Sequence, residues 1–148
     1  EEIKRVVDVN ITGMVNGTSV ALSEMKKQNF GYVYNMEGLG SNNMKIPQTL
    51  IYGGSKHFLT YFSVGCNKEL KEFKDIHVGR LQPGMVFTDL LTRNLGEDGK
   101  KIAKILGSEV NVVTPFLVEG MLKRKLYVKF LTTRKIMWRF MTSPFKKK

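Results

Sequence analysis

Apolar and polar residues follow different periods along this chain, and these periods predict its secondary structure. Apolar residues recur at helical spacing through residues 1–27, with acids at the start and Lys26 and Lys27 at the end, where they complement the helix dipole. Short apolar segments bounded by Gly, Asn, Asp or Pro predict strands. The strands are expected at residues 32–36, 76–81 and 126–131. Further helices are expected at residues 52–73, 100–106, 109–123 and 133–141.

This order of helices and strands predicts an α/β fold with a parallel sheet. In such sheets, ligands bind outside the carboxyl ends of the strands. Residues 35–41 follow the first predicted strand, residues 83–88 follow the second, and Tyr52 begins the helix between them. We therefore expect these three stretches to converge on one crevice.

The composition is that of one globular domain or part of one. Of the 148 residues, 42% are hydrophobic and 10% are aromatic, which excludes a disordered chain. The single cysteine, Cys66, excludes an internal disulfide, and its apolar helical surroundings favour a packed thiol over a nucleophile. No second cysteine and no His-x-x-x-His pattern offers a metal site. The charged start, Glu1-Glu2-Ile3-Lys4, does not predict a secretory signal.

The net charge of +11 is concentrated near the end of the chain. Residues 121–148 hold ten of the 24 Lys and Arg residues and none of the 13 acids. Nucleic acid is disfavoured as a partner because no helix-turn-helix or stacking motif accompanies these charges. An anionic membrane surface is favoured, although a solvated charged end and packing on the body of the protein stay open. The residues that suggest a membrane contact are Arg134, Lys135, Ile136, Met137, Trp138, Arg139, Phe140 and Met141.

The segment Tyr52-Gly53-Gly54-Ser55-Lys56 offers acid–base chemistry. Helical residues four apart share one face, so we expect the Lys56 ammonium near the Tyr52 hydroxyl. A cation about 4 Å away, at an effective dielectric constant of ~20, would lower a phenol pKa by about three units. A phenol with such a pKa exchanges protons near neutral pH. Because this spacing also arises by chance in many helices, the interpretation depends on the rest of the chain.

Two further motifs accompany this pair in a fixed order. Asn10 stands in Val7-Asp8-Val9-Asn10-Ile11-Thr12-Gly13, and the second predicted strand is followed by Pro83-Gly84-Met85-Val86-Phe87-Thr88. With these motifs the chain resembles the short-chain dehydrogenase/reductase superfamily. The resemblance implies a Rossmann-like three-layer α/β/α fold with a parallel sheet, of which these residues form the carboxyl-terminal half, and NADPH as cofactor.

The resemblance also implies a role for each motif. Tyr52 is the acid–base group, and Lys56 lowers its pKa and holds the nicotinamide ribose. The backbone of Asn10 positions a water molecule in the proton path. Ser41 is assigned the role of polarising the carbonyl. It stands closer to Tyr52 along the sequence than the family serine does, and the position that aligns with the family serine is Gly38. The residues expected to meet the nicotinamide are Pro83, Gly84, Val86 and Thr88.

A narrower resemblance is to the chlorophyll b reductases of plants and algae. It rests on residues 35–41, on residues 81–91 and on residues 128–132 with the basic aromatic helix after them. It implies that the formyl group of chlorophyll b is reduced to a hydroxymethyl group at the chloroplast thylakoid membrane. The resemblance assigns residues 1–131 to the carboxyl-terminal part of a short-chain reductase domain and residues 132–148 to a basic amphipathic tail. Apolar walls for a tetrapyrrole are expected from Phe87, Leu90, Leu91 and Leu95.

Two alternatives stay open. The first is a related reductase that acts on another apolar carbonyl compound. The second is an inactive fragment or pseudoenzyme that binds partners, which is favoured by the absence of the family's glycine-rich turn from these 148 residues. The sequence also leaves open the exact substrate, the choice between NADPH and NADH, and whether the protein forms a homo-oligomer or a hetero-oligomer.

Overall fold

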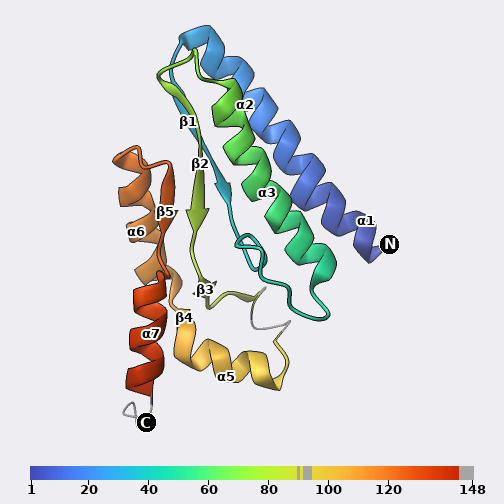
Figure 1. The fold of residues 1–148 in the computed structure, drawn as a ribbon, viewed down its shortest axis with the longest axis vertical. Helices are drawn as coiled ribbons and strands as arrows, with labels where there is room; N and C mark the ends of the chain where they lie inside the picture. Colours follow the sequence, from blue (N-terminus) through green and yellow to red (C-terminus); the bar gives the residue numbers. More distant parts are fainter. Residues whose placement is uncertain (90, 92–94, 144–148) are drawn as a thin grey trace. The chain divides into compact units, whose positions relative to one another are not determined.

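The computed structural model describes all residues except 90, 92–94 and 144–148. The chain forms two compact units (Figure 1). The first unit contains residues 1–81 and 124–127, and the second contains residues 82–123 and 128–148. In chain order, the elements are α1 (Glu2–Val7), the π-helical segment η1 (Asp8–Gly13), α2 (Met14–Gln28), β1 (Gly31–Met36) and α3 (Leu50–Glu69). They are followed by β2 (Ile76–Gln82), β3 (Met85–Val86), α5 (Glu97–Leu106), β4 (Gly107–Ser108), α6 (Val110–Leu122), β5 (Tyr127–Lys129) and α7 (Thr133–Thr142).

The long helix expected at residues 1–27 is present, but it contains a π-helical segment. At both junctions of η1 the backbone stays right-handed helical, with φ −61° at Asp8 and −65° at Met14, so α1, η1 and α2 form one continuous rod. The rod ends at Asn29, whose left-handed conformation (φ 60°) is typical of a helix C-cap. The widened segment therefore interrupts the hydrogen-bond pattern without ending the helix.

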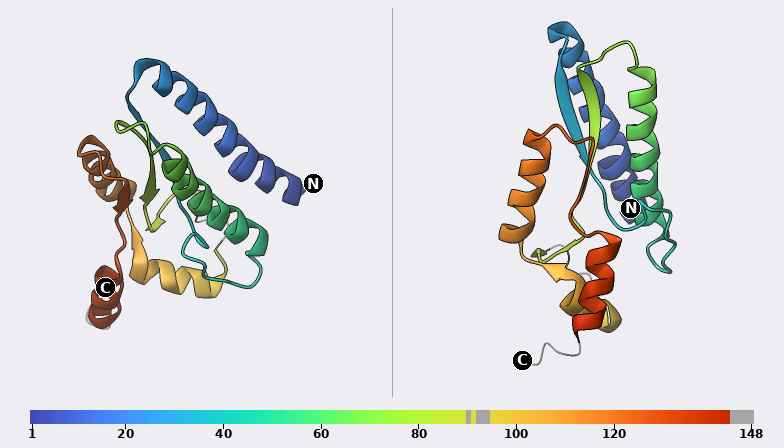
Figure 2. Two further views of the ribbon diagram at one scale, coloured as in Figure 1. Left: turned by 45° about the horizontal axis from the view of Figure 1, so that its top comes forward. Right: turned by 60° about the vertical axis from the view of Figure 1, so that its left-hand side comes forward.

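The sheet is built on a parallel pair of strands, as predicted. β1 and β2 pair from Gly31 opposite Ile76 to Met36 opposite Leu81, with α3 connecting them, and the strand order is β1-β2-β5. Within the first unit, α1–α2 and α3 run side by side next to these strands (Figures 1 and 2). Four buried apolar residues from α2, β2 and the end of α3 form its core: Met25, Leu70, Ile76 and Val78. The expected α/β fold class is confirmed.

Buried polar side chains hold α2, β1 and α3 together. Thr18 Oγ1 donates a hydrogen bond to Asn35 Oδ1 (3.2 Å), and Asn35 Nδ2 donates to Ser63 Oγ (3.1 Å). All three residues are buried. Because a buried polar group without a partner is destabilising, this chain of bonds fixes the rotation of each helix about its axis relative to β1.

A second polar contact joins α3 to β2. The Arg80 N–H donates to the Leu126 carbonyl (2.8 Å), just before β5 begins. Val78 lies two residues earlier on β2 and directs its backbone groups to the same edge, where β5 has not yet started. At this edge the Asn67 side chain of α3 makes the hydrogen bonds that a neighbouring strand would otherwise make. Its Nδ2 donates to the Val78 carbonyl (2.7 Å), and its Oδ1 accepts from the Val78 N–H (3.0 Å).

The second unit contains a short parallel pair of strands that the sequence pattern did not predict. β3 pairs with β4 through Met85 opposite Gly107 and Val86 opposite Ser108. Arg139 of α7 binds the β4 region by donating to the carbonyls of Leu106 (2.6 Å) and Gly107 (3.2 Å) and to Ser108 Oγ (2.8 Å).

Two further contacts hold the second unit together. Lys135 Nζ lies 4.0 Å from the Phe130 ring centroid, and a side chain at Gly120 of α6 would collide with Val128 of β5. Among the residues that the structure describes, no helix combines the length and the hydropathy needed to span a bilayer.

The contact between Asn67 and Val78 predicts a large stability difference between two neighbouring variants. Asn67→Ala leaves a buried N–H and a buried carbonyl of β2 without partners, so we expect the free energy of unfolding to fall by about 2–4 kcal/mol. Lys68→Ala changes the adjacent, exposed residue and should alter it by less than about 0.5 kcal/mol. Urea titration of both variants checks this prediction, and equal midpoints would contradict it.

Candidate functional site

Tyr52 and Lys56 lie on one face of α3, as their spacing predicts. Lys56 Nζ lies 5.8 Å from the centroid of the Tyr52 ring and donates a hydrogen bond to the Met36 carbonyl (3.2 Å). Met36 is the last residue of β1. The first turns of α3 and the carboxyl end of β1 thus come together, which is where ligands bind in parallel sheets.

The turn after β1 lies directly against these two side chains. A Cβ atom at Gly38 would lie 2.6 Å from the Tyr52 hydroxyl and 3.2 Å from Lys56 Cγ. Gly40 has φ +99°, and a Cβ atom there would lie 2.4 Å from the Cα of Gly53. Glycine is therefore required at Gly40, where a side chain would collide with the α3 backbone, and a side chain at Gly38 would push the Tyr52 hydroxyl aside.

Burial changes the acid–base properties of the pair in a direction that the sequence did not predict. Burial raises the pKa of the Tyr52 phenol above its ordinary value, and burial lowers the pKa of the Lys56 ammonium. The expected lowering of the Tyr52 pKa by Lys56 is wrong for this structure, in which the ammonium hydrogen-bonds to Met36. At neutral pH, Tyr52 therefore carries its proton and can act as a hydrogen-bond donor and an acid.

Ser41 is buried between the turn and α3. Its Oγ accepts a hydrogen bond from the Gly38 N–H (3.1 Å) and donates to the Lys56 carbonyl (3.1 Å). The hydroxyl thus fastens residues 38–41 to the helix that carries Tyr52. The predicted role of Ser41 in polarising a carbonyl stays a prediction, and it requires the hydroxyl to turn away from Lys56.

Asn10 reaches the same region from the π-helical segment. Its Nδ2 donates to Ser55 Oγ (3.0 Å), and Ser55 Oγ donates to the Tyr52 carbonyl (2.7 Å). π-helical turns occur frequently at functional sites. The contact with the buried Ser55 was not foreseen from the sequence, although Ser55 stands directly before Lys56.

The residues expected to contact the nicotinamide lie in the second unit. Gly84 has φ +78°, and a Cβ atom at this position would lie 2.7 Å from Leu131 Cβ. Pro83 precedes it, Val86 belongs to β3, and Thr88 Oγ1 accepts from the Leu91 N–H (3.3 Å). That these residues meet Tyr52 in one crevice stays a prediction.

The apolar residues expected to surround a tetrapyrrole also belong to the second unit. Phe87 packs over Gly107, and Leu95 packs over Gly99. Leu91 is half-buried, and Leu90 lies outside the described residues. These contacts occur within the unit itself, so a role in binding a substrate stays a prediction.

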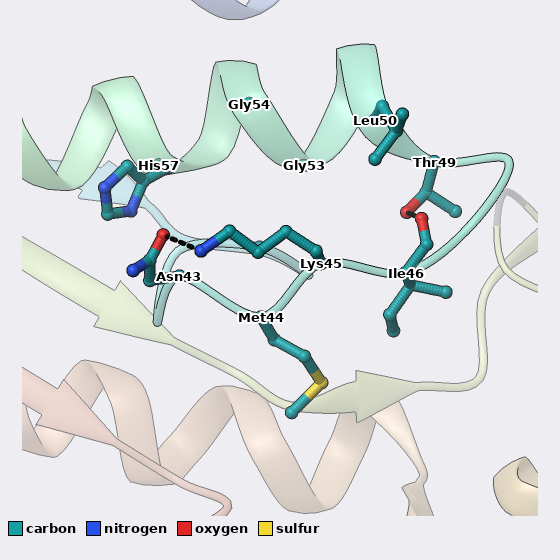
Figure 3. Close-up of a pocket in the computed structure, with 10 residues that line it drawn as sticks. Asn43, Met44, Lys45, Ile46, Thr49, Leu50, Gly53, Gly54 and His57 are labelled. Atoms are coloured by element: carbon teal, nitrogen blue, oxygen red, sulfur yellow. Dashed lines mark hydrogen bonds between the residues drawn. The ribbon is translucent and has the colours of Figure 1, made fainter.

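Two hollows adjoin the start of α3. One, of about 230 Å³, lies between α3 and the loop that follows residue 40, and it includes Met44, Ile46 and His57 (Figure 3). In this loop Lys45 Nζ donates to Asn43 Oδ1 (2.9 Å). The other hollow, of about 370 Å³, is lined by Tyr52 and by Glu2, Ile3, Val6, Gln48, Thr49, Leu50 and Ile51.

The two histidines of the chain lie in different surroundings: His57 lines the first of these hollows, with its Nδ1 3.4 Å from the Ser41 carbonyl oxygen. His77 packs against the Tyr32 ring at 4.9 Å, as its position in a strand predicts. Within the described part of the chain, no group of three or more His, Cys, Asp or Glu residues could hold a metal ion. Glu37 is the residue that sequence reasoning missed. It is an acid placed directly after an apolar strand, and it is 4% exposed.

Comparisons with known proteins identify the family of this chain. A family model described as short chain dehydrogenase matches residues 1–98. A probable chlorophyll(ide) b reductase of Oryza sativa subsp. japonica, described as chloroplastic, is 33% identical over 122 residues, which are 82% of this chain and 24% of that protein. A second chloroplastic chlorophyll(ide) b reductase of the same plant is 29% identical over 143 residues, 89% of this chain and 42% of that protein. The chain thus spans less than half the length of these relatives.

The fold is also similar to that of a solved structure. A short-chain dehydrogenase from Sphingobium yanoikuyae in complex with NADPH superimposes with a TM-score of 0.70 at 20% identity. The similarity covers 97% of this chain and 54% of that one. At this identity the likeness supports the fold.

The raised pKa of Tyr52 can be measured directly. We expect the phenolate absorbance that is lost in Tyr52→Phe to appear with a midpoint above the ordinary value of about 10. Since the folded state holds this proton more tightly than the unfolded state, the stability it contributes is complete below about pH 10 and is lost as the pH rises through the raised pKa. Spectrophotometric titration of the parent minus Tyr52→Phe measures the midpoint, and a value below about 10 would contradict burial as the dominant effect.

Proposed function

This chain belongs to the short-chain dehydrogenase family, and on that premise we propose that the protein containing it reduces a carbonyl group with NADPH, using Tyr52 as the acid. The observation that carries the proposal is the Tyr52 phenol, which is protonated, lies against the Gly38 backbone and has Lys56 one helical turn away. A protonated phenol beside an ammonium is a proton donor whose anion is stabilised as soon as it forms.

Lys56 fits a nicotinamide ribose. An ammonium group donates up to three hydrogen bonds, and Lys56 donates one, to the Met36 carbonyl, among the described residues. Two donors remain for the neighbouring hydroxyl groups of a ribose. Pro83, Gly84, Val86 and Thr88 would border the nicotinamide ring. When bound, NADPH supplies the hydride that adds to the carbonyl carbon.

The residues of the chain provide the proton and its return path. Tyr52 donates its proton to the carbonyl oxygen as the C–H bond forms, so the product is an alcohol. The Lys56 ammonium stabilises the resulting phenolate by charge attraction. Asn10 is anchored through Ser55, and its widened helical turn would hold a water molecule that returns a proton to Tyr52. Ser41 would polarise the carbonyl after releasing Lys56.

The substrate we propose is the formyl group of chlorophyll b, reduced to a hydroxymethyl group in the chloroplast at the thylakoid membrane. The support is the naming of the two rice relatives as chloroplastic chlorophyll(ide) b reductases, together with the similarity across 82–89% of this chain. A different apolar carbonyl compound is the alternative substrate, and the same acid–base residues would serve it.

We also propose that the exposed face of α7 contacts an anionic membrane surface. Arg134, Met137, Trp138 and Met141 recur at helical spacing, and the three apolar residues among them are 57–63% exposed. Arg139 and Lys135 were among the residues that suggested this contact, but both are engaged within the second unit. The proposed contact therefore depends on an apolar face and few charges. Each charge contributes about 1 kcal/mol at most to the free energy of membrane binding.

The catalytic proposal predicts a contrast between two tyrosines of α3. In the whole protein, Tyr52→Phe should lower NADPH oxidation with a formyl tetrapyrrole by about 10²–10⁴-fold, because the proton donor is removed. Tyr61→Phe makes the same change at a residue of the same helix that is 77% exposed, and it should leave activity within twofold. Activity of Tyr52→Phe within tenfold of the parent would exclude Tyr52 as the acid. If the unsubstituted protein shows no carbonyl reductase activity, the result would favour the alternative of an inactive fragment or pseudoenzyme.

The membrane proposal predicts a contrast between two exposed aromatic residues. Trp138→Ala should reduce sedimentation with anionic vesicles several-fold, because the indole suits the membrane interface. Tyr61→Ala removes a similarly exposed ring in the first unit and should have no effect. Binding that persists in Trp138→Ala, or that disappears completely when salt screens the charges, would contradict an apolar contact through α7.

A further inference from the structure

Glu37 is a buried acid that the proposed reaction does not use. Its side chain is 3% exposed. Its Oε1 accepts hydrogen bonds from Arg80 Nη1 (2.9 Å) and Thr60 Oγ1 (3.1 Å), and its Oε2 accepts from the Tyr127 hydroxyl (3.1 Å). The Arg80 guanidinium also stacks on the Tyr127 ring, 4.4 Å from the centroid. One carboxylate thus joins β1, β2, α3 and the first residue of β5 within the first unit.

Such an arrangement strongly resists displacement of the carboxylate. A buried carboxylate is tolerated when a cation and hydrogen-bond donors satisfy it, and removal of one partner leaves an uncompensated charge. The backbone of Glu37 is fixed as well, because its N–H donates to the Leu81 carbonyl (2.8 Å). Both the side chain and the main chain therefore hold this residue in place.

The two neighbours of Glu37 are the residues that touch the acid–base pair. Met36 accepts the hydrogen bond from Lys56, and the backbone of Gly38 lies against the Tyr52 hydroxyl. Thr60 connects the carboxylate to α3 one turn after Lys56. A shift of Glu37 would therefore move the Lys56 acceptor and uncover the Tyr52 phenol together.

We propose that Glu37 is a positioning residue, which holds Met36 and Gly38 against Lys56 and Tyr52 and thereby sets the geometry of proton donation. The proposal rests on the reductase function proposed above. Glu37 itself does not exchange a proton with the substrate. Its effect passes through the carbonyl of Met36 and the backbone of Gly38.

The test compares Glu37→Ala with Asn67→Ala in the whole protein, since both changes remove buried hydrogen bonds of the first unit, but Asn67 lies away from residues 36–38. At a temperature where every variant is folded, Glu37→Ala should lower kcat at least tenfold and raise the KM for NADPH. Asn67→Ala should leave both within twofold. Glu37→Gln keeps an acceptor oxygen for Arg80 and Thr60, so it should retain more activity than Glu37→Ala. It also supplies the test if Glu37→Ala does not fold.

A second measurement does not depend on turnover. The midpoint of the Tyr52 phenolate absorbance is obtained by subtracting the titration of the matching Tyr52→Phe double variant. In the Glu37 variants this midpoint should move toward the ordinary value for tyrosine, because the phenol becomes less covered. It should stay at the parental value in Asn67→Ala. An unchanged midpoint in both Glu37 variants would overturn the proposal, as would equal losses of kcat in Glu37→Ala and Asn67→Ala. If the midpoint shifts in the Glu37 variants as expected but the unsubstituted protein has no reductase activity, positioning by Glu37 is supported and the proposed reaction is refuted.

Discussion

The close approach of the turn at residues 38–41 to the first turns of α3 is the constraint on which the site depends. Gly40 and Gly53 allow backbone to meet backbone, and Gly38 leaves room for the Tyr52 hydroxyl. The turn satisfies its own polar groups at short range, through Ser41 N–H to the Gly38 carbonyl and Asn43 N–H to the Gly40 carbonyl. The parallel pairing of β1 with β2 then places this turn beside the first turns of α3. Strand register and acid–base geometry are therefore fixed by the same contacts.

Burial dominates the electrostatics of the acid–base pair. Desolvation favours the neutral form of every group, so it raises the pKa of the Tyr52 phenol and lowers that of the Lys56 ammonium. Both shifts oppose the phenolate–ammonium state, whereas direct attraction between the charges favours it. In the reaction proposed above, Tyr52 would hold its proton before the substrate reacts, and the charge pair would form only as the proton is transferred. The buried Glu37 side chain accepts hydrogen bonds from three donors, one of which is the Arg80 cation.

Long periodic segments were predictable from the sequence, and contacts between distant segments were not. The rod at residues 1–27 and the strands at 32–36 and 76–81 were expected at nearly their observed positions, because apolar periodicity and the turn residues that bound each segment mark them in the sequence. The helix expected to reach residue 73 ends at Glu69, where Leu70 turns into the core. β3 and β4 have two residues each, too few for a period to appear. The bond from Tyr127 to Glu37 spans 90 residues, and the covering of the Tyr52 hydroxyl likewise depends on a turn that only the fold brings to it.

The π-helical segment around Asn10 has a consequence for comparing related sequences. A π-helix closes its hydrogen bonds over five residues instead of four, so it uses one residue more than an α-helix to connect the same two ends. A homologue with a regular helix here would align with a single-residue gap in the middle of an unbroken rod. Such a gap would record a change of helical winding and not a shortened loop. Side chains on either side of it would keep their neighbours, and only those between Asp8 and Gly13 would change the direction in which they point.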